Sequence, residues 1–414
     1  MKAMFCIRIG SKWQRVFPLL LIVVGVWVGC GKTPKTNRPK VPGVVVDHSA
    51  ASTGRYIGSP SIAILPNKDY VASHDYFGPR AGHCKAATTA LFSSSDQGNT
   101  WHRIATIKPL FWGKLFVHRG DLYTLGITHQ YGDIVIRRSR DGGKTWTEPI
   151  DSKTGRLTEG AHYHRAPCPL LVHDGRIWFA VEQKGDVKKP WGDFITMVVS
   201  TPEGADLLDA SNWTFSDAIK PRKEWLDRQF RAWLEGNVVR TPQGRVVNIL
   251  RVNTLKDNTT ARGQAAVVHV SDNAVGTSFD PNKDIIDFPG GAKKFAIQYD
   301  PVSKRYWSLV NYVRPEDVGK ANAGSIRNTL ALTSSPDLEN WTIHSIILHH
   351  PDAEKVGFQY VDWAFGGNDL IAVSRTAYDD GHKGSRRAHD ANYLTFHRIK
   401  DFRDKQSQIL ESQK

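Results

Sequence analysis

Residues 94–101, Ser-Ser-Asp-Gln-Gly-Asn-Thr-Trp, recur at residues 139–146 as Ser-Arg-Asp-Gly-Gly-Lys-Thr-Trp. Within this Ser-x-Asp-x-Gly-x-Thr-Trp pattern the carboxylate accepts hydrogen bonds from its own turn, and glycine permits a positive φ. A degraded copy occupies residues 334–341, and a weaker one runs from Ser200 to Trp213. The pattern predicts tight hairpin turns that recur through a chain built from repeats.

A second repeat is a pair of strand-like runs around a polar turn, first seen at residues 61–73. It returns five times, with turns at residues 119–120, 174–175, 243–244, 301–304 and 366–367. Each unit of roughly 50 to 70 residues leads into one or two further strands, as a four-stranded blade would. The chain is therefore predicted to be all-β, a β-propeller of six four-stranded blades. A short seventh blade stays open as an alternative.

The last unit is one strand short, whereas the run Val44-Val45-Val46 stands alone near the start. If this early strand pairs into the last blade, it closes the ring and removes its exposed edges. We therefore expect one domain over residues 44–405.

The first 29 residues have the layout of a secretory signal, with four Lys or Arg followed by the apolar run 16–28. Gly29-Cys30 resembles a bacterial lipobox, which implies that Cys30 is lipidated and that residues 30–43 form a tether. Trp27 replaces the usual aliphatic residue there, so plain secretion is the alternative. The sequence thus predicts an exported, membrane-anchored protein.

The net charge is +14. Nucleic acid is the first partner such a charge suggests, but export and the scatter of the basic residues favour an acidic polysaccharide or an anionic surface. A solvated basic exterior is the plain alternative.

Cys84 and Cys168 either pair or stay free. No metal-spaced cluster, phosphate loop or Gly-x-Ser-x-Gly elbow appears, so no metal or cofactor is implied.

In a propeller the innermost strands begin near the central axis, so polar residues at those positions converge on one pocket. Here they are Gly58-Ser59-Pro60, Lys114, His164-Arg165-Ala166-Pro167, Glu235-Gly236-Asn237, Lys293-Lys294 and Gln359-Tyr360-Val361-Asp362. Several of them are charged, which predicts a functional pocket on the axis.

These positions resemble the sialidase superfamily across about residues 55 to 400. Glu235 and Arg251 look like the family's glutamate and second arginine, Arg327 like its third arginine, and Tyr360 like its nucleophilic tyrosine. The resemblance implies a glycosidase in which Glu235 activates Tyr360 and arginines hold a substrate carboxylate. The expected activity is removal of a terminal acidic or acid-linked sugar from glycans.

Two features depart from the family. Gly58-Ser59-Pro60 stands where the family has Arg-x-Pro, and the only nearby match is Arg165-Ala166-Pro167 on the third blade. The acid/base aspartate has no clear counterpart, so His74 and Asp75 are the candidate proton donors.

His74, with Tyr163 and His164 at another inner strand, supports a second hypothesis. This set is loosely similar to propeller rhamnosyl-glucuronate hydrolases and ulvan lyases, and Arg165 would then bind substrate with Tyr163 and His164. A non-catalytic glycan-binding propeller is the third possibility. His389-Asp390 is set aside, because adjacent residues in a strand face opposite ways.

Overall fold

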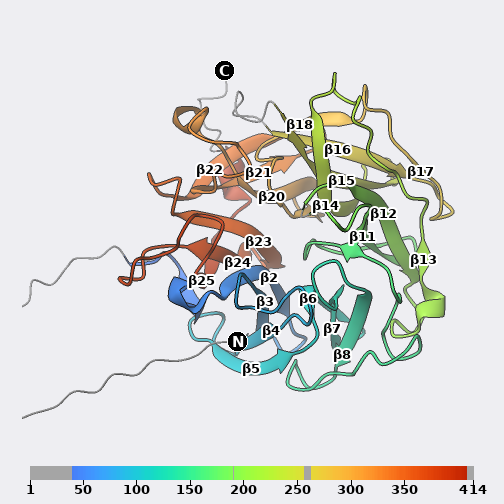
Figure 1. Cartoon of the computed structure of the whole chain (residues 1–414), viewed down its shortest axis with the longest axis horizontal. Helices are drawn as coiled ribbons and strands as arrows, with labels where there is room; N and C mark the ends of the chain where they lie inside the picture. Colours follow the sequence, from blue (N-terminus) through green and yellow to red (C-terminus); the bar gives the residue numbers. More distant parts are fainter. Residues whose placement is uncertain (1–39, 190, 256–262, 408–414) are drawn as a thin grey trace, which may run out of the picture. The chain divides into compact units, whose positions relative to one another are not determined.

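The structure, a computed structural model, describes residues 40–189, 191–255 and 263–407, and these form six antiparallel sheets arranged in a ring (Figure 1). The colours of Figure 1 pass around the ring from blue to red, so that β23–β25 lie beside β2–β5. The predicted signal segment, Cys30 and most of the predicted tether lie outside the described residues. The prediction of an all-β, six-bladed propeller is confirmed.

The strands of the first three blades follow one another along the chain, as hairpin-linked strands do. They are β2 (Tyr56–Ile64), β3 (Tyr70–Phe77), β4 (Thr89–Ser94) and β5 (His102–Ile107) in the first blade; β6 (Phe111–His118), β7 (Asp121–Ile127) and β8 (Ile134–Ser139) in the second; and β9 (Tyr163–His164), β10 (Leu171–His173), β11 (Arg176–Lys184), β12 (Phe194–Pro202) and β13 (Thr214–Phe215) in the third.

The other three blades repeat the arrangement, and short 3-10 helices lie between strands or at the chain end. The strands are β14 (Phe230–Arg240), β15 (Val246–Thr254), β16 (Gly263–Val270), β17 (Thr277–Ser278) and β18 (Ile285–Phe288) in the fourth blade; β19 (Ile297–Asp300), β20 (Arg305–Asn311), β21 (Thr329–Ser335) and β22 (Thr342–His349) in the fifth; and β23 (Gly357–Gly366), β24 (Asp369–Ala377), β25 (Tyr393–Ile399) and β1 (Val44–His48) in the sixth. The helices are η1 (Ala51–Thr53), η2 (Ala210–Asn212), η3 (Pro315–Asp317) and η4 (Asp404–Ser407).

The second blade differs from the predicted four strands, because its sheet contains only β6, β7 and β8. A single bridge between Val135 and Arg156 occupies the place of the missing outer strand. Pro149, in the segment that leads to this bridge, has no amide hydrogen to donate to a ladder. Pro149 therefore cannot donate a ladder hydrogen bond in the loop that stands where the other blades have a strand.

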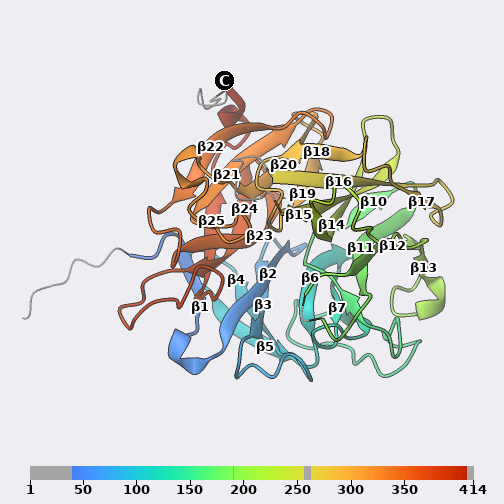
Figure 2. The same ribbon diagram turned by 45° about the horizontal axis from the view of Figure 1, so that its top comes forward.

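The ring is closed by β1, which pairs antiparallel with β25, as the sequence predicts. Val44 lies opposite Phe396, and His48 lies opposite Tyr393. The first strand of the chain is thus the outermost strand of its last blade. Figure 2 shows the inner strands β2, β6, β14 and β23 around the middle, with β5, β13, β17 and β22 at the rim.

Three outer hairpin turns share one hydrogen-bond pattern, at residues 94–101, 139–146 and 335–341. In the first, Ser94 Oγ donates to Asp96 Oδ1 at 2.8 Å, and the Trp101 indole donates to the Gly98 carbonyl at 3.1 Å. The other two turns repeat both contacts. The weaker copy does not repeat this pattern, because its Trp213 indole donates to the carbonyl of Leu207, six residues earlier. These turns lie on strand connections and contribute to the scaffold.

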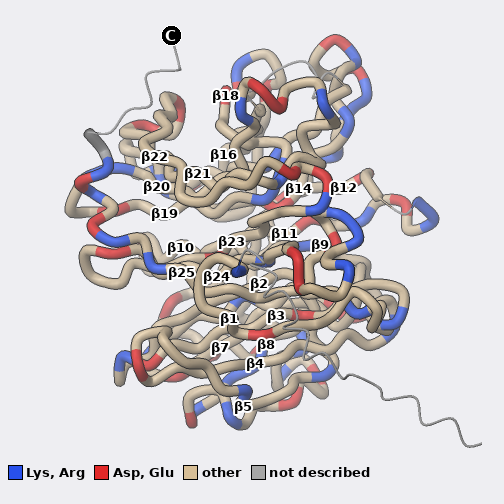
Figure 3. The backbone as a smooth tube through the Cα atoms, turned by 90° about the vertical axis from the view of Figure 1, so that its left-hand side faces the viewer, with Lys and Arg blue, Asp and Glu red and all other residues tan. Residues whose placement is uncertain are grey.

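Two further observations concern thiols and charge. Cys84 is exposed and Cys168 is buried, and both are free thiols, which decides between the two alternatives left open by the sequence. Lys and Arg are intermixed with Asp and Glu over the molecule (Figure 3).

In the described part of the chain, no helix has the length and apolar character needed to cross a membrane.

Candidate functional site

Four of the six inner strands carry the same irregularity close to the axis. In β2, β6, β14 and β23 two residues oppose one residue of the partner strand, which defines a β-bulge. The first residue of each bulge is Gly58, Trp112, Glu235 or Tyr360, and all four line one cavity. A bulge re-aims a side chain that the regular pleat would direct elsewhere. Each of these four blades thus delivers one bulge residue to a common centre.

Three of these bulge residues have an unfavourable backbone conformation. The φ angles of Trp112, Glu235 and Tyr360 are +51°, +62° and +55°. Each such angle in a residue other than glycine costs about 1–3 kcal/mol and persists only where the surroundings enforce it. Strain of this kind, repeated at three positions around one cavity, marks a functional site.

The cavity on the axis, hereafter the axial cavity, has a volume of about 240 Å³. Its wall from the first three blades combines polar side chains with the aromatic rings of Phe77, Phe111, Trp112, Tyr131 and Trp191. The opposite wall, from the fourth and sixth blades, contributes Glu235, Tyr360 and Arg375. The volume fits a small polar ligand such as one sugar unit.

Glu235 and Arg251 form a buried ion pair beside Tyr360. Arg251 Nη1 lies 2.6 Å from Glu235 Oε2, and both side chains are less than a tenth exposed. Burial raises the pKa of Glu235, but Arg251, His164 and a hydrogen bond from Tyr360 outweigh it and hold that pKa below its usual value. Glu235 is therefore an anion at neutral pH and can accept a proton.

The phenol of Tyr360 is held in its protonated form. Burial, and next the charge of Glu235, raise the pKa of Tyr360. Two further guanidinium groups flank its ring, with Arg375 Cζ at 4.8 Å and Arg327 Cζ at 5.6 Å from the ring centroid. The four residues Glu235, Arg251, Arg327 and Tyr360, which the sequence singled out together, thus lie in one cluster.

Arg375 completes this cluster, although the sequence analysis did not select it. It lies opposite Gln359, which precedes Tyr360, just as Arg251 lies opposite Leu234, which precedes Glu235. The two arginines are thus equivalent positions of two blades. Comparing the repeats position by position would have found Arg375.

His74 and Asp75 are neighbours with different surroundings. Asp75 lines the axial cavity, where its carboxylate accepts the amide hydrogens of Ser59 at 3.1 Å and Trp112 at 2.8 Å. Burial, opposed by these two bonds, raises the pKa of Asp75 to about 6. A carboxyl group with this pKa can donate a proton in mildly acidic solution.

His74, the other candidate proton donor, does not lie at the axial cavity. Its side chain is buried, Nε2 lies 2.8 Å from Asp47 Oδ2, and it is not among the residues that line the axial cavity. Neighbouring residues of a strand face opposite ways, so a strand that directs Asp75 to the axis directs His74 away from it. His74 connects β3 to β1 instead.

On the third blade, His164 and Arg165 line the axial cavity but Tyr163 does not. His164 Nδ1 lies 2.8 Å from Glu182 Oε2, and Glu182 Oε1 accepts the amide hydrogen of Gly236 at 3.1 Å. Tyr163 is instead buried in the core between blades, so the prediction that it binds substrate is not supported by its position. Glu182 is a residue that the sequence analysis missed.

His389 and Asp390, set aside from the sequence, are in contact. His389 Nδ1 lies 2.9 Å from Asp390 Oδ1, because both residues are in the loop before β25 and not in a strand. His389 lines the axial cavity. Burial and the neighbouring Arg375 lower the pKa of His389 to about 3, so its imidazole is neutral.

Among the residues that the structure describes, no group of three or more His, Cys, Asp or Glu is placed to hold a metal ion. The polar side chains of the axial cavity include guanidinium, carboxyl, phenol and imidazole groups. This set suits proton transfer and the binding of an anionic sugar.

No protein-family model matches the sequence, and a search of curated proteins finds no match. Solved structures do resemble the chain. A Hadza microbial sialidase superposes with a TM-score of 0.58 at 12% identity, covering 86% of this chain and 68% of that one. The arabinanase of Penicillium chrysogenum, solved with arabinobiose, gives 0.51 at 14% identity, covering 87% and 98%. The sialidase of Trypanosoma rangeli, solved with sialic acid, gives 0.52 at 14% identity, covering 87% and 57%.

At these identities the likeness concerns the fold. The chain has the six-bladed propeller fold found in sialidases and arabinanases, and the sialidase-like resemblance drawn from its sequence is confirmed at that level.

Proposed function

We propose that the protein is a glycoside hydrolase that removes a terminal acidic sugar from glycans. The observation that carries the proposal is Tyr360, which lines the axial cavity together with Glu235 and has the guanidinium groups of Arg327 and Arg375 beside its ring. Arginine binds carboxylates through paired hydrogen bonds, so arginines around a potential nucleophile favour an anionic sugar. The fold neighbours include two sialidases, which supports the same class.

Tyr360 acts as the nucleophile. Its oxygen forms a bond to the anomeric carbon while its proton passes to Glu235, because burial leaves no free phenolate beforehand. The bond between the anomeric carbon and the leaving oxygen breaks, and that oxygen takes a proton from Asp75. Water then attacks the same carbon and gives a proton to Asp75, and Tyr360 leaves and recovers its proton from Glu235.

The proposal is tested by offering the purified protein sialosides, rhamnosyl-glucuronates and ulvan and identifying the products. Tyr360→Phe removes the attacking oxygen, and turnover should fall about 10³-fold or more. Glu235→Gln removes the base, and turnover should fall about 10²- to 10⁴-fold with the thermal midpoint within about 4 °C of the parent. Equal activity in either variant would remove the assignment.

A second candidate is a uronate lyase, favoured by His164 with its partner Glu182 next to Arg165 in the same cavity. A lyase leaves an unsaturated uronate, which absorbs ultraviolet light, whereas a hydrolase leaves a saturated sugar. Binding without any product would favour the third hypothesis, a glycan-binding propeller.

We also propose that the protein is exported and anchored through a lipid on Cys30. Support comes from the basic start of the chain, the apolar run 16–28 and Gly29-Cys30. An anchored enzyme of this class would act on glycans outside the cytoplasm.

A further inference from the structure

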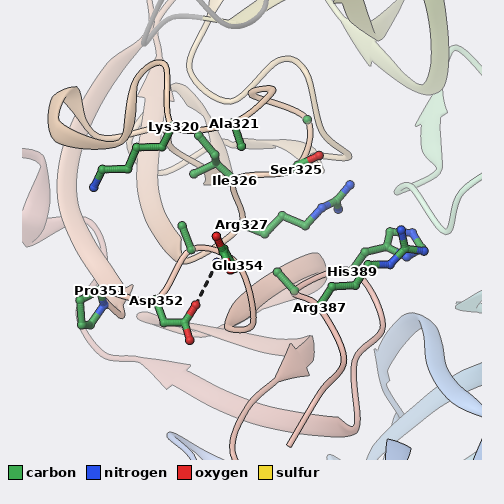
Figure 4. A pocket seen from close by; sticks show the side chains of 13 residues that line it. Lys320, Ala321, Ser325, Ile326, Arg327, Pro351, Asp352, Glu354, Arg387 and His389 are labelled. Atoms are coloured by element: carbon green, nitrogen blue, oxygen red, sulfur yellow. Dashed lines mark hydrogen bonds between the residues drawn. The ribbon is translucent and has the colours of Figure 1, made fainter.

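A second, larger cavity adjoins the axial one. This outer cavity has a volume of about 600 Å³ and is formed by the loops at residues 320–327, 351–354 and 387–389, between the fifth and sixth blades. In Figure 4, Arg327 and Glu354 lie in its middle, with Lys320 and Pro351 toward one side and Arg387 and His389 toward the other. None of its side chains except Arg327 and His389 has a part in the site described above.

The two cavities share residues at their junction. His389 lines both of them. Arg327 lines the outer cavity, while its guanidinium lies 5.6 Å from the ring of Tyr360 in the axial site. Arg327 Nη1 donates a hydrogen bond to Gln359 Oε1 at 2.6 Å, but the buried Nε of Arg327 has no hydrogen-bond partner. A ligand that fills the axial cavity therefore meets the outer cavity at these two side chains.

The three cations that line the outer cavity, Lys320, Arg327 and Arg387, are offset by nearby carboxylates, unlike the cations around Tyr360. Lys320 is paired with Asp317 at 2.8 Å, and Arg387 is paired with Asp390 at 3.0 Å. Two further carboxylates, of Asp352 and Glu354, are part of the lining. The outer cavity therefore offers both donors and acceptors without an excess of positive charge, which suits a hydroxyl-rich neutral ligand and not a second anion.

We infer that the outer cavity binds the uncharged sugar units that follow the terminal acidic sugar, so that the substrate is an oligosaccharide or a polysaccharide end. The inference rests on the proposed function, because it takes the axial cavity as the site of the acidic sugar. The volumes agree with this division, since the axial cavity fits one sugar unit and the outer cavity is more than twice as large.

The experiment measures binding by calorimetry in the Glu235→Gln background, in which substrate is not consumed. The probes are free N-acetylneuraminic acid and 3′-sialyllactose, which carries the same acidic sugar followed by two neutral ones. We expect sialyllactose to bind at least about 10-fold more tightly. Ala321→Trp adds a large side chain at an exposed position of the outer cavity and should remove this difference, leaving the affinity for the free acid unchanged.

Ala218→Trp is the matched control, since Ala218 is also exposed but lies away from both cavities. It should retain the preference for sialyllactose. Equal affinities of the two probes in the parent, or a preference that survives Ala321→Trp, would overturn the inference and leave the proposed function standing. Binding of neither probe would overturn the assignment of an acidic sugar to the axial cavity, and this inference with it.

Discussion

The carboxylate of Asp75 occupies the space in front of Gly58. A Cβ atom at Gly58 would lie 1.6 Å from Asp75 Oδ1 and 2.6 Å from the Asp75 main-chain oxygen. No side chain is compatible with this contact, so an arginine at position 58, where the related motif has Arg-x-Pro, does not fit this arrangement. The bulge position that holds Trp112, Glu235 or Tyr360 in other blades is here occupied by a carboxylate from the neighbouring strand.

Gly58→Ala is therefore expected to destabilise the protein by about 1–3 kcal/mol, as overpacking of a close contact does. Gly58→Ala combined with Asp75→Gly should recover part of this loss, because the clash with Oδ1 is gone but the main-chain contact stays. Chemical denaturation of the two single variants and the double variant measures the coupling. Additive effects would show that the two residues do not compete for this space.

The scaffold was predictable from the sequence because it depends on local signals that repeat. The turn at residues 94–101 recurs with its bonding residues intact, and the lone strand Val44–His48 pairs into the last blade, which is otherwise one strand short. The register of inner strands also predicted that Glu235 and Tyr360 meet. These features can be predicted because they follow from two general rules, the alternation of side chains along a strand and the closure of a propeller ring.

The parts of the site that escaped prediction depend on bulges and on contacts between blades. The bulge at residues 58–59 of β2 puts two residues opposite Asp75 of β3, and it brings the Asp75 carboxylate to the amide of Ser59. Arg375 enters the site from a second strand, and Glu182 contacts Gly236 of the next blade. Neither contact has a signal within its own stretch of sequence.

His74 should matter for stability and not for catalysis. Asp47→Ala leaves its buried imidazole without its carboxylate partner, which should cost about 1–3 kcal/mol while kcat stays unchanged. The pKa of Asp47 is lowered in the folded protein, although burial acts to raise it, because bonding to His74 prevails. The contribution of Asp47 to the free energy of unfolding is therefore fully present above the ordinary aspartate pKa, and it is lost as the pH falls through the lowered pKa of Asp47. Denaturation curves at neutral and acidic pH test this, and a large fall in kcat would contradict it.

Asp75 should set the alkaline side of the pH profile. With a pKa of about 6, it is protonated below that pH and loses its proton above it. If it is the acid, kcat/KM falls about tenfold for each pH unit above about 6. Asp75→Asn should lower turnover about 10²- to 10⁴-fold and abolish the fall of kcat/KM on the alkaline side of the pH profile. An aryl glycoside with a good leaving group needs little protonation of its leaving oxygen, so Asp75→Asn should be less impaired on it than on a glycan substrate. Equal losses of turnover on the aryl glycoside and on the glycan would point to another role for Asp75.

Arg375 should contribute to substrate binding more than to the chemical step. Its side chain lies between the rings of Phe77 and Tyr360, at 4.2 Å and 4.8 Å from their centroids. Lysine keeps the charge but loses the planar fork, so Arg375→Lys should raise KM about 10-fold with a smaller change in kcat. Arg119→Lys, at an exposed turn of the second blade, is the control. An unchanged KM would exclude Arg375 from carboxylate binding.

Cys30 should determine where the protein is found after export. Lipidation of this cysteine would place the mature protein in the membrane fraction, while Cys30→Ala would prevent the modification. The measurement is the partition of the protein between membrane and soluble fractions after cell lysis, with glycosidase activity followed in both. Cys84→Ala is the matched control, because it removes an exposed thiol from the propeller and not the anchor. If the parent and Cys30→Ala partition alike, the protein is secreted without a lipid or is held at the membrane by another part of the chain.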